Sequence, residues 1–204
     1  MHNIKRDKLI KAVLAVCIAV FTFCVVYFNA FSYLDNMLCD AVYQRSDVPS
    51  KEISIIAIDE KTMAEYGDVS TWDRSIYAEL VEKLTADSAY APKLIVFDIL
   101  FVSDKDEAGD AHFAKACDEA GVPVITAANF VQRAELFRDE TGRFVLDEAN
   151  IQMVEFPYAS LKNASEYGFA NTTLDTDGFV RNAMRSVSYG GETIDSLAYV
   201  IYRK

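Results

Sequence analysis

Five side chains beyond the N-terminal apolar run have the chemistry to bind a small ligand: Asp59, Trp72, Arg74, Asp98 and Asp110. Two or three converging carboxylates can bind a hard cation such as calcium or magnesium. An arginine beside a tryptophan can bind an anion or a planar ring. We therefore predict ligand binding at these residues, and no cofactor unless the carboxylates hold a divalent cation, whose identity the sequence leaves unknown.

The same residues also have structural roles open to them. Asp59 and Asp110 precede helical patterns and can cap those helices. Asp98 interrupts an apolar run, where it can accept hydrogen bonds from backbone amides or pair with Arg74. The residue types alone leave both interpretations open.

A complete set of catalytic residues is missing from the sequence. The only histidines are His2 and His112, and no P-loop, GxGxxG or HExxH motif occurs. The four cysteines lack the spacing of a zinc site, and Cys39 with Cys117 could form one disulfide or remain buried thiols. We expect a protein that is not an enzyme, with metal-dependent hydrolysis at the acidic residues as the remaining catalytic alternative.

Two apolar runs would bring the acidic residues to one end of a sheet. Residues 53–58 (ISIIAI) and 93–101 (KLIVFDILF) are typical of strands that are buried on both faces. Helical patterns at 60–66 and 73–86 lie between them, which predicts a right-handed parallel crossover. Ligands bind beyond the carboxyl ends of such strands, where the loops diverge.

The later segments complete a predicted α/β fold with a three-layer domain, a mainly parallel sheet and added antiparallel hairpins. The elements are, in order, a helix at 111–120 capped by Asp110, a strand at 122–127, hairpins at 132–146 and 167–188, a turn at Gly190 and Gly191, and a helix from 194 to the end. The last pattern breaks off at Lys204, so we expect the domain to continue beyond it.

The N-terminal segment predicts a membrane anchor. Residues 12–31 contain no charge, and a helix of this length spans about 30 Å, the thickness of the hydrocarbon core of a bilayer. Four basic residues precede the run, namely Lys5, Arg6, Lys8 and Lys11, whereas the whole chain carries a net charge of −11. Cationic flanks remain cytoplasmic, so the acidic remainder is expected outside. A cleaved signal peptide is the alternative, although the run ends without the pair of small residues that a cleavage site needs.

These patterns divide the chain into four segments. They are a cytoplasmic segment at 1–11, a transmembrane signal anchor at 12–33, an amphipathic juxtamembrane helix at 34–48 and an extracellular domain at 49–204. The acidic exterior argues against nucleic acid as a partner. A helix that continues from the anchor could carry movement across the membrane.

Four stretches in this order resemble a known family: ISIIAIDEKTM, TWDRSIYAELVEKL, KLIVFDILF and GFANTTLDTDGFVRN. They resemble the second type of the CHASE family, the extracellular sensory domains associated with cyclases and histidine kinases. The chain departs from the family at Trp72, where a neighbouring proline is usual and Thr71 and Asp73 stand instead.

The resemblance implies a sensor in the cell membrane of a bacterium. It would receive an unknown small extracellular ligand and pass the signal to a nucleotide cyclase, histidine kinase or Ser/Thr kinase that is absent from this chain. A homodimer is expected because the family's effectors commonly work as dimers. The alternative is a membrane-tethered solute-binding or adhesion protein without an effector.

Overall fold

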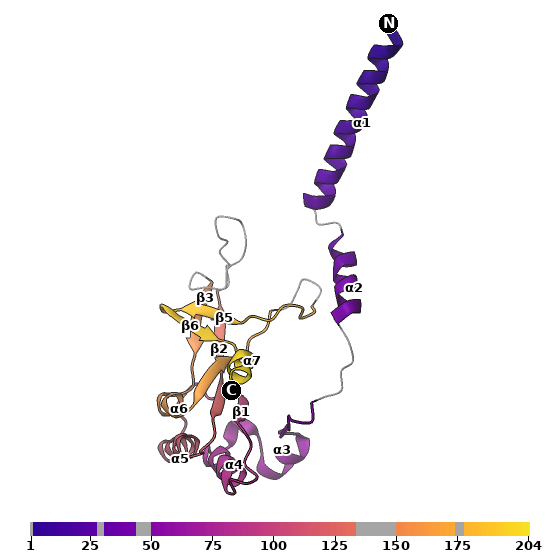
Figure 1. Cartoon of the computed structure of the whole chain (residues 1–204). Helices are drawn as coiled ribbons and strands as arrows, with labels where there is room; N and C mark the ends of the chain where they lie inside the picture. The colour runs from indigo at the N-terminus through magenta and orange to yellow at the C-terminus, as the bar shows by residue number, and fades with distance from the viewer. Residues whose placement is uncertain (1, 28–30, 44–49, 134–149, 174–177) are drawn as a thin grey trace. The chain divides into compact units, whose positions relative to one another are not determined.

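Figure 1 shows the chain as a computed structural model, which describes residues 2–27, 31–43, 50–133, 150–173 and 178–204. The chain divides into two compact units, Met1–Ala57 and Ile58–Lys204. The first unit is helical, and the second contains the strands.

The first unit contains two helices. Within α1 (His2–Tyr27), the stretch Leu9–Tyr27 is long and apolar enough to cross a membrane. α2 (Ser32–Tyr43) is amphipathic, with apolar residues recurring every three or four positions. The helix predicted at 34–48 is thus present as far as Tyr43, and the junction between α1 and α2 lies outside the described residues.

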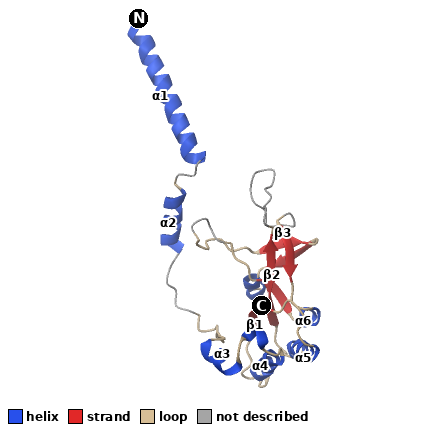
Figure 2. Cartoon of the chain, turned by 180° about the vertical axis from the view of Figure 1, so that it is seen from behind, coloured by secondary structure: helices blue, strands red, loops and turns tan. Residues whose placement is uncertain are grey.

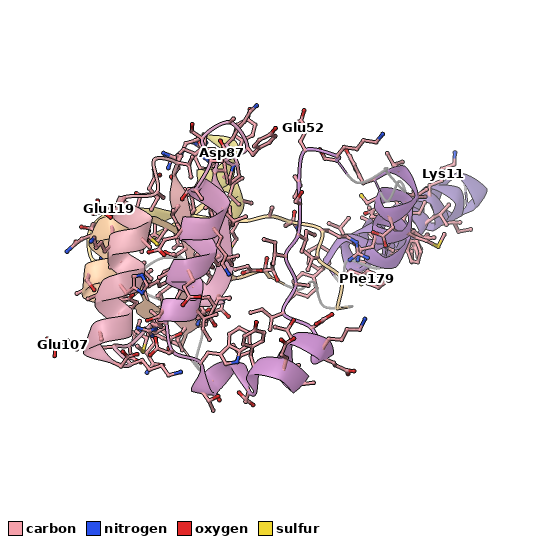
Figure 3. The ribbon with its side chains drawn as sticks, turned by 90° about the horizontal axis from the view of Figure 1, so that it is seen from below. Lys11, Glu52, Asp87, Glu107, Glu119 and Phe179 are labelled. Atoms are coloured by element: carbon pink, nitrogen blue, oxygen red, sulfur yellow. The ribbon has the colours of Figure 1, made fainter. Side chains whose placement is uncertain are left out.

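The strand predicted at 53–58 is absent from this structure, so that prediction was wrong. Figure 3 shows the chain passing from Glu52 towards α3 without a helix or strand. Ile55 is 86% exposed, whereas Ile58, the first residue of the second unit, packs against the core of that unit. A β-branched run favours an extended backbone, but a strand also needs a neighbour that completes the ladder.

A mixed four-stranded sheet organises the second unit. The central strand β2 (Val124–Gln132) pairs in parallel with β1 (Ile95–Leu100) and β4 (Glu166–Phe169), and antiparallel with β3 (Ile151–Glu155). The α/β class is confirmed, but the sheet is mixed rather than mainly parallel, because β3 runs antiparallel to β2. β2 extends beyond the end of β1, and β3 pairs with the second half of β2 in the opposite direction.

A separate hairpin joins β5 (Ser186–Tyr189) to β6 (Glu192–Asp195). Gly190 and Gly191 form its turn with φ of 62° and 76°, and positive φ at both central residues is what a type I′ turn requires. This confirms the turn but contradicts the hairpin at 167–188, because the first part of that segment is β4, which pairs with β2. The other predicted hairpin lies almost entirely outside the described residues.

Short helices surround the sheet. They are α3 (Glu60–Tyr66), the 3-10 turn η1 (Val69–Thr71), α4 (Ser75–Thr85), α5 (Glu107–Asp118), α6 (Ala159–Ala164) and α7 (Leu197–Tyr202). α3 has the predicted bounds, and α4 lies within the predicted range. α5 begins earlier than predicted, because Asp106 rather than Asp110 caps it by accepting a hydrogen bond from the Gly109 amide at 2.6 Å.

Helices cover both faces of the sheet in this unit (Figure 2). On one face α4, α5 and α6 enclose an aromatic core that includes Tyr77, Phe97, Phe101 and Phe113. On the other face Leu197 and Val200 of α7 pack against Ile125 and Ala127 of β2. The result is a three-layer α/β arrangement around β1 and β2.

Candidate functional site

Arg74 and Asp110 form a buried ion pair between the start of α4 and α5. Arg74 Nη1 lies 2.6 Å from Asp110 Oδ1, and the two residues are only 7% and 5% exposed. Arg74 Nη2 donates to the Ser103 carbonyl, and its guanidinium lies 4.3 Å from the centre of the Tyr158 ring. The pairing of Arg74 with Asp98 that the sequence suggested is therefore wrong, because Asp110 is the partner.

Asp110 and Lys105 extend this pair into a network. Asp110 Oδ2 accepts from the Lys105 amide at 2.7 Å, and Lys105 Nζ donates to the carbonyls of Ser70 at 2.6 Å and Trp72 at 2.5 Å. We call Arg74, Ser103, Lys105, Asp110 and Tyr158 the Arg74 clamp. The clamp joins the loop that follows β1 to the segment that precedes α4.

Tyr158, the residue that precedes α6, completes the clamp. Its hydroxyl donates to the Asp110 carbonyl at 2.9 Å, and its ring stacks with the Arg74 guanidinium. Burial raises the pKa of Tyr158 above its ordinary value, so the hydroxyl stays protonated and able to donate. In the described part of the chain, no buried side-chain nitrogen or oxygen lacks a hydrogen-bond partner.

Trp72 contributes to the same region through the core. Its side chain is buried, and its indole Nε1 donates to the Gly67 carbonyl at 3.0 Å. The ring lies 6.1 Å, centre to centre, from both Tyr66 and Tyr77. Trp72 thus positions the loop that contains Ser70 and Trp72, whose carbonyls accept hydrogen bonds from Lys105 Nζ.

Asp59 and Asp98 lie outside the clamp. Asp59 caps α3, where it accepts hydrogen bonds from the Thr62 amide and hydroxyl, both at 2.9 Å, and these bonds lower its pKa. Asp98 is exposed on β1. The structure therefore brings together Trp72, Arg74 and Asp110, but not all five predicted residues.

A pocket of about 380 Å³ borders the clamp. Its lining comes from the loop after β1, from α5 and from α6: Asp104, Lys105, Asp106, Glu107, Asp110, Ala111 and Ser160. Four of these seven lining residues are acidic, and Figure 3 shows Glu107 at one end of α5 and Glu119 at the other. In the described residues no group of three or more histidine, cysteine, aspartate or glutamate side chains is arranged to hold a metal ion.

Sequence reasoning missed Lys105 and Tyr158, and it named Asp110 instead of Asp106 as the cap of α5. The signal for Lys105 was present, because it is the single cation within an acidic stretch, a position that favours a specific partner. Asp106 precedes a first helical turn that contains two further acidic residues, Glu107 and Asp110, which is typical of a helix start. Tyr158 gave no local signal, since its role depends on contacts with residues distant in sequence.

The cysteines form no disulfide in this structure. Cys39 is exposed and Cys117 is buried, and both are free. Burial raises the pKa of the Cys117 thiol to about 12, so this side chain behaves as a small apolar group of the core.

One comparison with known proteins identifies the family. The family model of the CHASE2 domain matches residues 13–204, which is nearly the whole chain. No curated protein and no solved structure matches. CHASE2 domains are extracytoplasmic sensory domains associated with cyclases and kinases, and they are not catalytic in themselves. The effector domain is not among these 204 residues. The match confirms the resemblance seen in the sequence, and the chain belongs to the CHASE2 domain family.

Proposed function

We propose that this chain is the signal-receiving part of a bacterial transmembrane receptor. Its family and the apolar helix α1 support this role. In this proposal the basic residues before the apolar stretch remain in the cytoplasm, and the second unit lies outside. Two copies act as a homodimer, and a nucleotide cyclase, histidine kinase or Ser/Thr kinase elsewhere in the receptor responds to the signal.

The observation that carries the proposed site is the Arg74 clamp beside the pocket. Lys105 lines the pocket and also holds the carbonyls of Ser70 and Trp72. A ligand that contacts the rim changes the electrostatic field at Lys105. It therefore changes the relative stability of two conformations, one with the Lys105 hydrogen bonds to the Ser70 and Trp72 carbonyls formed and one with them broken. Asp110 contributes from the pocket wall, with Arg74 as its buried partner.

Thermal unfolding of the full chain in lipid nanodiscs tests this site. We would add calcium, magnesium and a panel of small metabolites to the wild type and to two matched variants. Glu107→Gln removes a charge from the pocket rim, whereas Glu119→Gln removes one from the opposite end of α5. A compound present at about a hundred times its dissociation constant adds about 2.7 kcal/mol to the free energy of unfolding.

We expect at least one compound to raise the melting temperature of the wild type and of Glu119→Gln, with a smaller rise in Glu107→Gln. The proposed site is wrong if the rise is equal in all three proteins. In the full receptor, the same compound should change effector activity. Binding without such a change would favour the tethered solute-binding or adhesion protein.

A further inference from the structure

One side of α2 presents an exposed apolar surface. Leu34, Met37, Leu38 and Val42 are between 46% and 62% exposed, and Ala41 lies exposed among them. These residues follow one another at helical spacings, which places them on the same side of the helix. We call the five residues the α2 apolar face. A contiguous apolar surface of this kind marks a contact with a membrane or with another protein.

The charge of α2 argues against the membrane surface as the cover of this face. Asp35 and Asp40 are the charged residues of α2, which contains no lysine, arginine or histidine. Helices that lie on a membrane surface typically carry basic residues on their polar side, because anionic headgroups attract them. A helix with two carboxylates in that place is repelled, so the α2 apolar face needs a protein partner.

The short connection from α1 makes a second copy the nearest protein partner. Four residues separate Tyr27, the end of α1, from Ser32, the start of α2. Even fully extended, this connection spans only about 18 Å. Two copies whose α1 helices meet in a membrane therefore bring their α2 helices together on the same side of it. Such confinement raises the effective concentration of each α2 for the other.

We propose that α2 pairs with α2 of a second copy as a parallel, two-stranded coiled coil. The contact runs through Leu34, Met37 and Ala41, whose spacings of three and four match the a, d and a positions of a heptad. Leu38 lies beside this seam at position e. The proposal rests on the proposed function, because it names the surface through which the homodimer forms.

The polar residues of α2 fit this register. Asn36 and Cys39 occupy positions c and f, on the side away from the partner, and Asp35 and Asp40 occupy b and g. No charged residue stands at a or d, so like charges do not meet within the seam. The twelve residues of α2 make fewer than two heptads, so pairing depends on the confinement that α1 provides.

Disulfide cross-linking of the full chain in membrane vesicles tests the seam. The three cysteines of the first unit are replaced by alanine, and single cysteines are then introduced as Leu34→Cys or Ala41→Cys. The matched controls are Asn36→Cys and the natural Cys39 retained alone. A disulfide needs Cα atoms within about 7 Å, which equivalent a positions satisfy and equivalent c or f positions do not. We expect covalent dimers to form about tenfold or more faster at the two seam positions than at the two controls.

A charge placed in the seam should slow the cross-linking. Adding Leu34→Asp to Ala41→Cys should reduce the rate about tenfold, because two carboxylates would then face each other at an apolar contact. Adding Asn36→Asp introduces the same charge on the far side of α2, and it should leave the rate unchanged.

Equal rates at all four cysteine positions, or the fastest rate at either control, would overturn the proposal. Slow cross-linking at every position would also overturn it. Protection of Leu34→Cys from a water-soluble maleimide would in that case assign the α2 apolar face to lipid or to another part of the same chain. None of these measurements uses a ligand, so a failed seam leaves the test at Glu107 intact, and absence of ligand binding leaves the seam intact.

Discussion

Arg74 shows why residue type alone cannot separate a ligand contact from a structural one. Its guanidinium has a carboxylate, a backbone carbonyl and an aromatic ring as partners within the protein. A bound molecule could offer the same three kinds of partner. The sequence alone therefore could not decide between a ligand-binding and a structural role for Arg74. Burial decides the question for the folded chain, since an arginine this deeply buried needs a counter-charge.

Removing one member of this pair should be strongly destabilising. Arg74→Met leaves Asp110 buried without its counter-charge, and we expect a loss of about 3–5 kcal/mol in the free energy of unfolding. Urea titration of the full chain measures it. Lys115→Met is the control, because the Lys115 and Glu119 pair is exposed and 3.9 Å apart, and its loss should cost between about 0 and 1 kcal/mol.

A small effect of Arg74→Met would contradict this expectation. It would mean that Asp110 is satisfied by the Lys105 amide alone. Arg74 would then be free to act on a ligand, as the sequence first suggested. The combined variant Arg74→Met with Asp110→Leu should be less destabilised than Arg74→Met, because no unpaired charge remains.

Gly168 is a second residue whose identity is set by a contact distant in sequence. A Cβ atom at this position would lie 2.7 Å from the backbone of Leu197, at the start of α7. Gly168→Ala should therefore displace α7 from the sheet and cost about 1–3 kcal/mol, as overpacking usually does. The measurement is amide exchange of residues 197–202, which should become faster.

Gly121→Ala separates this effect from backbone strain. Gly121 has φ of 69°, and its missing Cβ would meet no atom within 4 Å. Alanine there strains the backbone but leaves α7 in place, so exchange in α7 should match the wild type. If Gly168→Ala also leaves α7 unchanged, the sheet accommodates the methyl group and the close approach is unimportant.

At the scale of whole elements, signals within a segment predicted its helical bounds well, but they did not predict which strands pair across long distances in sequence. The bounds of α3 were predicted correctly because both of its ends are specified nearby, by Asp59 at the start and Gly67 at the end. β4 was assigned to the wrong partner because its four residues pair with β2, far away in sequence. The run at 53–58 has a strong strand pattern, yet pattern cannot supply the neighbour that a strand needs.

α3 should depend heavily on its cap, because it has no buried residue to hold it. The Thr62 hydrogen bonds lower the pKa of Asp59 below its usual 3.8. A lowered pKa means that the ionised carboxylate stabilises the fold, so the contribution is complete above pH 3.8 and is lost as pH falls through the lowered pKa. Asp59→Ala should speed amide exchange in α3 near neutral pH.

The pH dependence distinguishes the cap from a general effect of the substitution. The difference between the wild type and Asp59→Ala should be constant from about pH 5 to 7 and shrink below about pH 4. Asp59→Asn also caps helices well, and it should keep most of the protection without this pH dependence. A difference that persists at low pH would show that protonated Asp59 still caps α3.

For the whole molecule, three of the five residues that the sequence grouped lie near one another, and ligand binding at them stays a prediction. Arg74 pairs with Asp110, and Lys105 binds the Trp72 carbonyl, because the loop after β1 meets the segment that precedes α4. Asp59 and Asp98 were added on the assumption of two adjacent buried strands, and the first of these is not formed here. Lys105 and Tyr158 complete the clamp through tertiary contacts that no local pattern reveals.

The proposed membrane orientation can be tested with the natural cysteines. Cys39 is exposed on α2, which the proposal places outside, whereas burial and a pKa raised to about 12 make Cys117 unreactive. Cys17 and Cys24 lie within the apolar stretch that would cross the membrane. A membrane-impermeant maleimide should therefore label the wild type on intact cells, and Cys39→Ser should remove most of the label.

Adding Tyr90→Cys to the Cys39→Ser protein makes the same test for the second unit. Tyr90 is highly exposed, so labelling of intact cells should return if this unit lies outside. Labelling that requires permeabilised cells for both Cys39 and Tyr90→Cys would place both units in the cytoplasm. The acidic pocket would then face cytoplasmic rather than external ligands, and the proposed receptor function would fail even if the pocket bound a ligand.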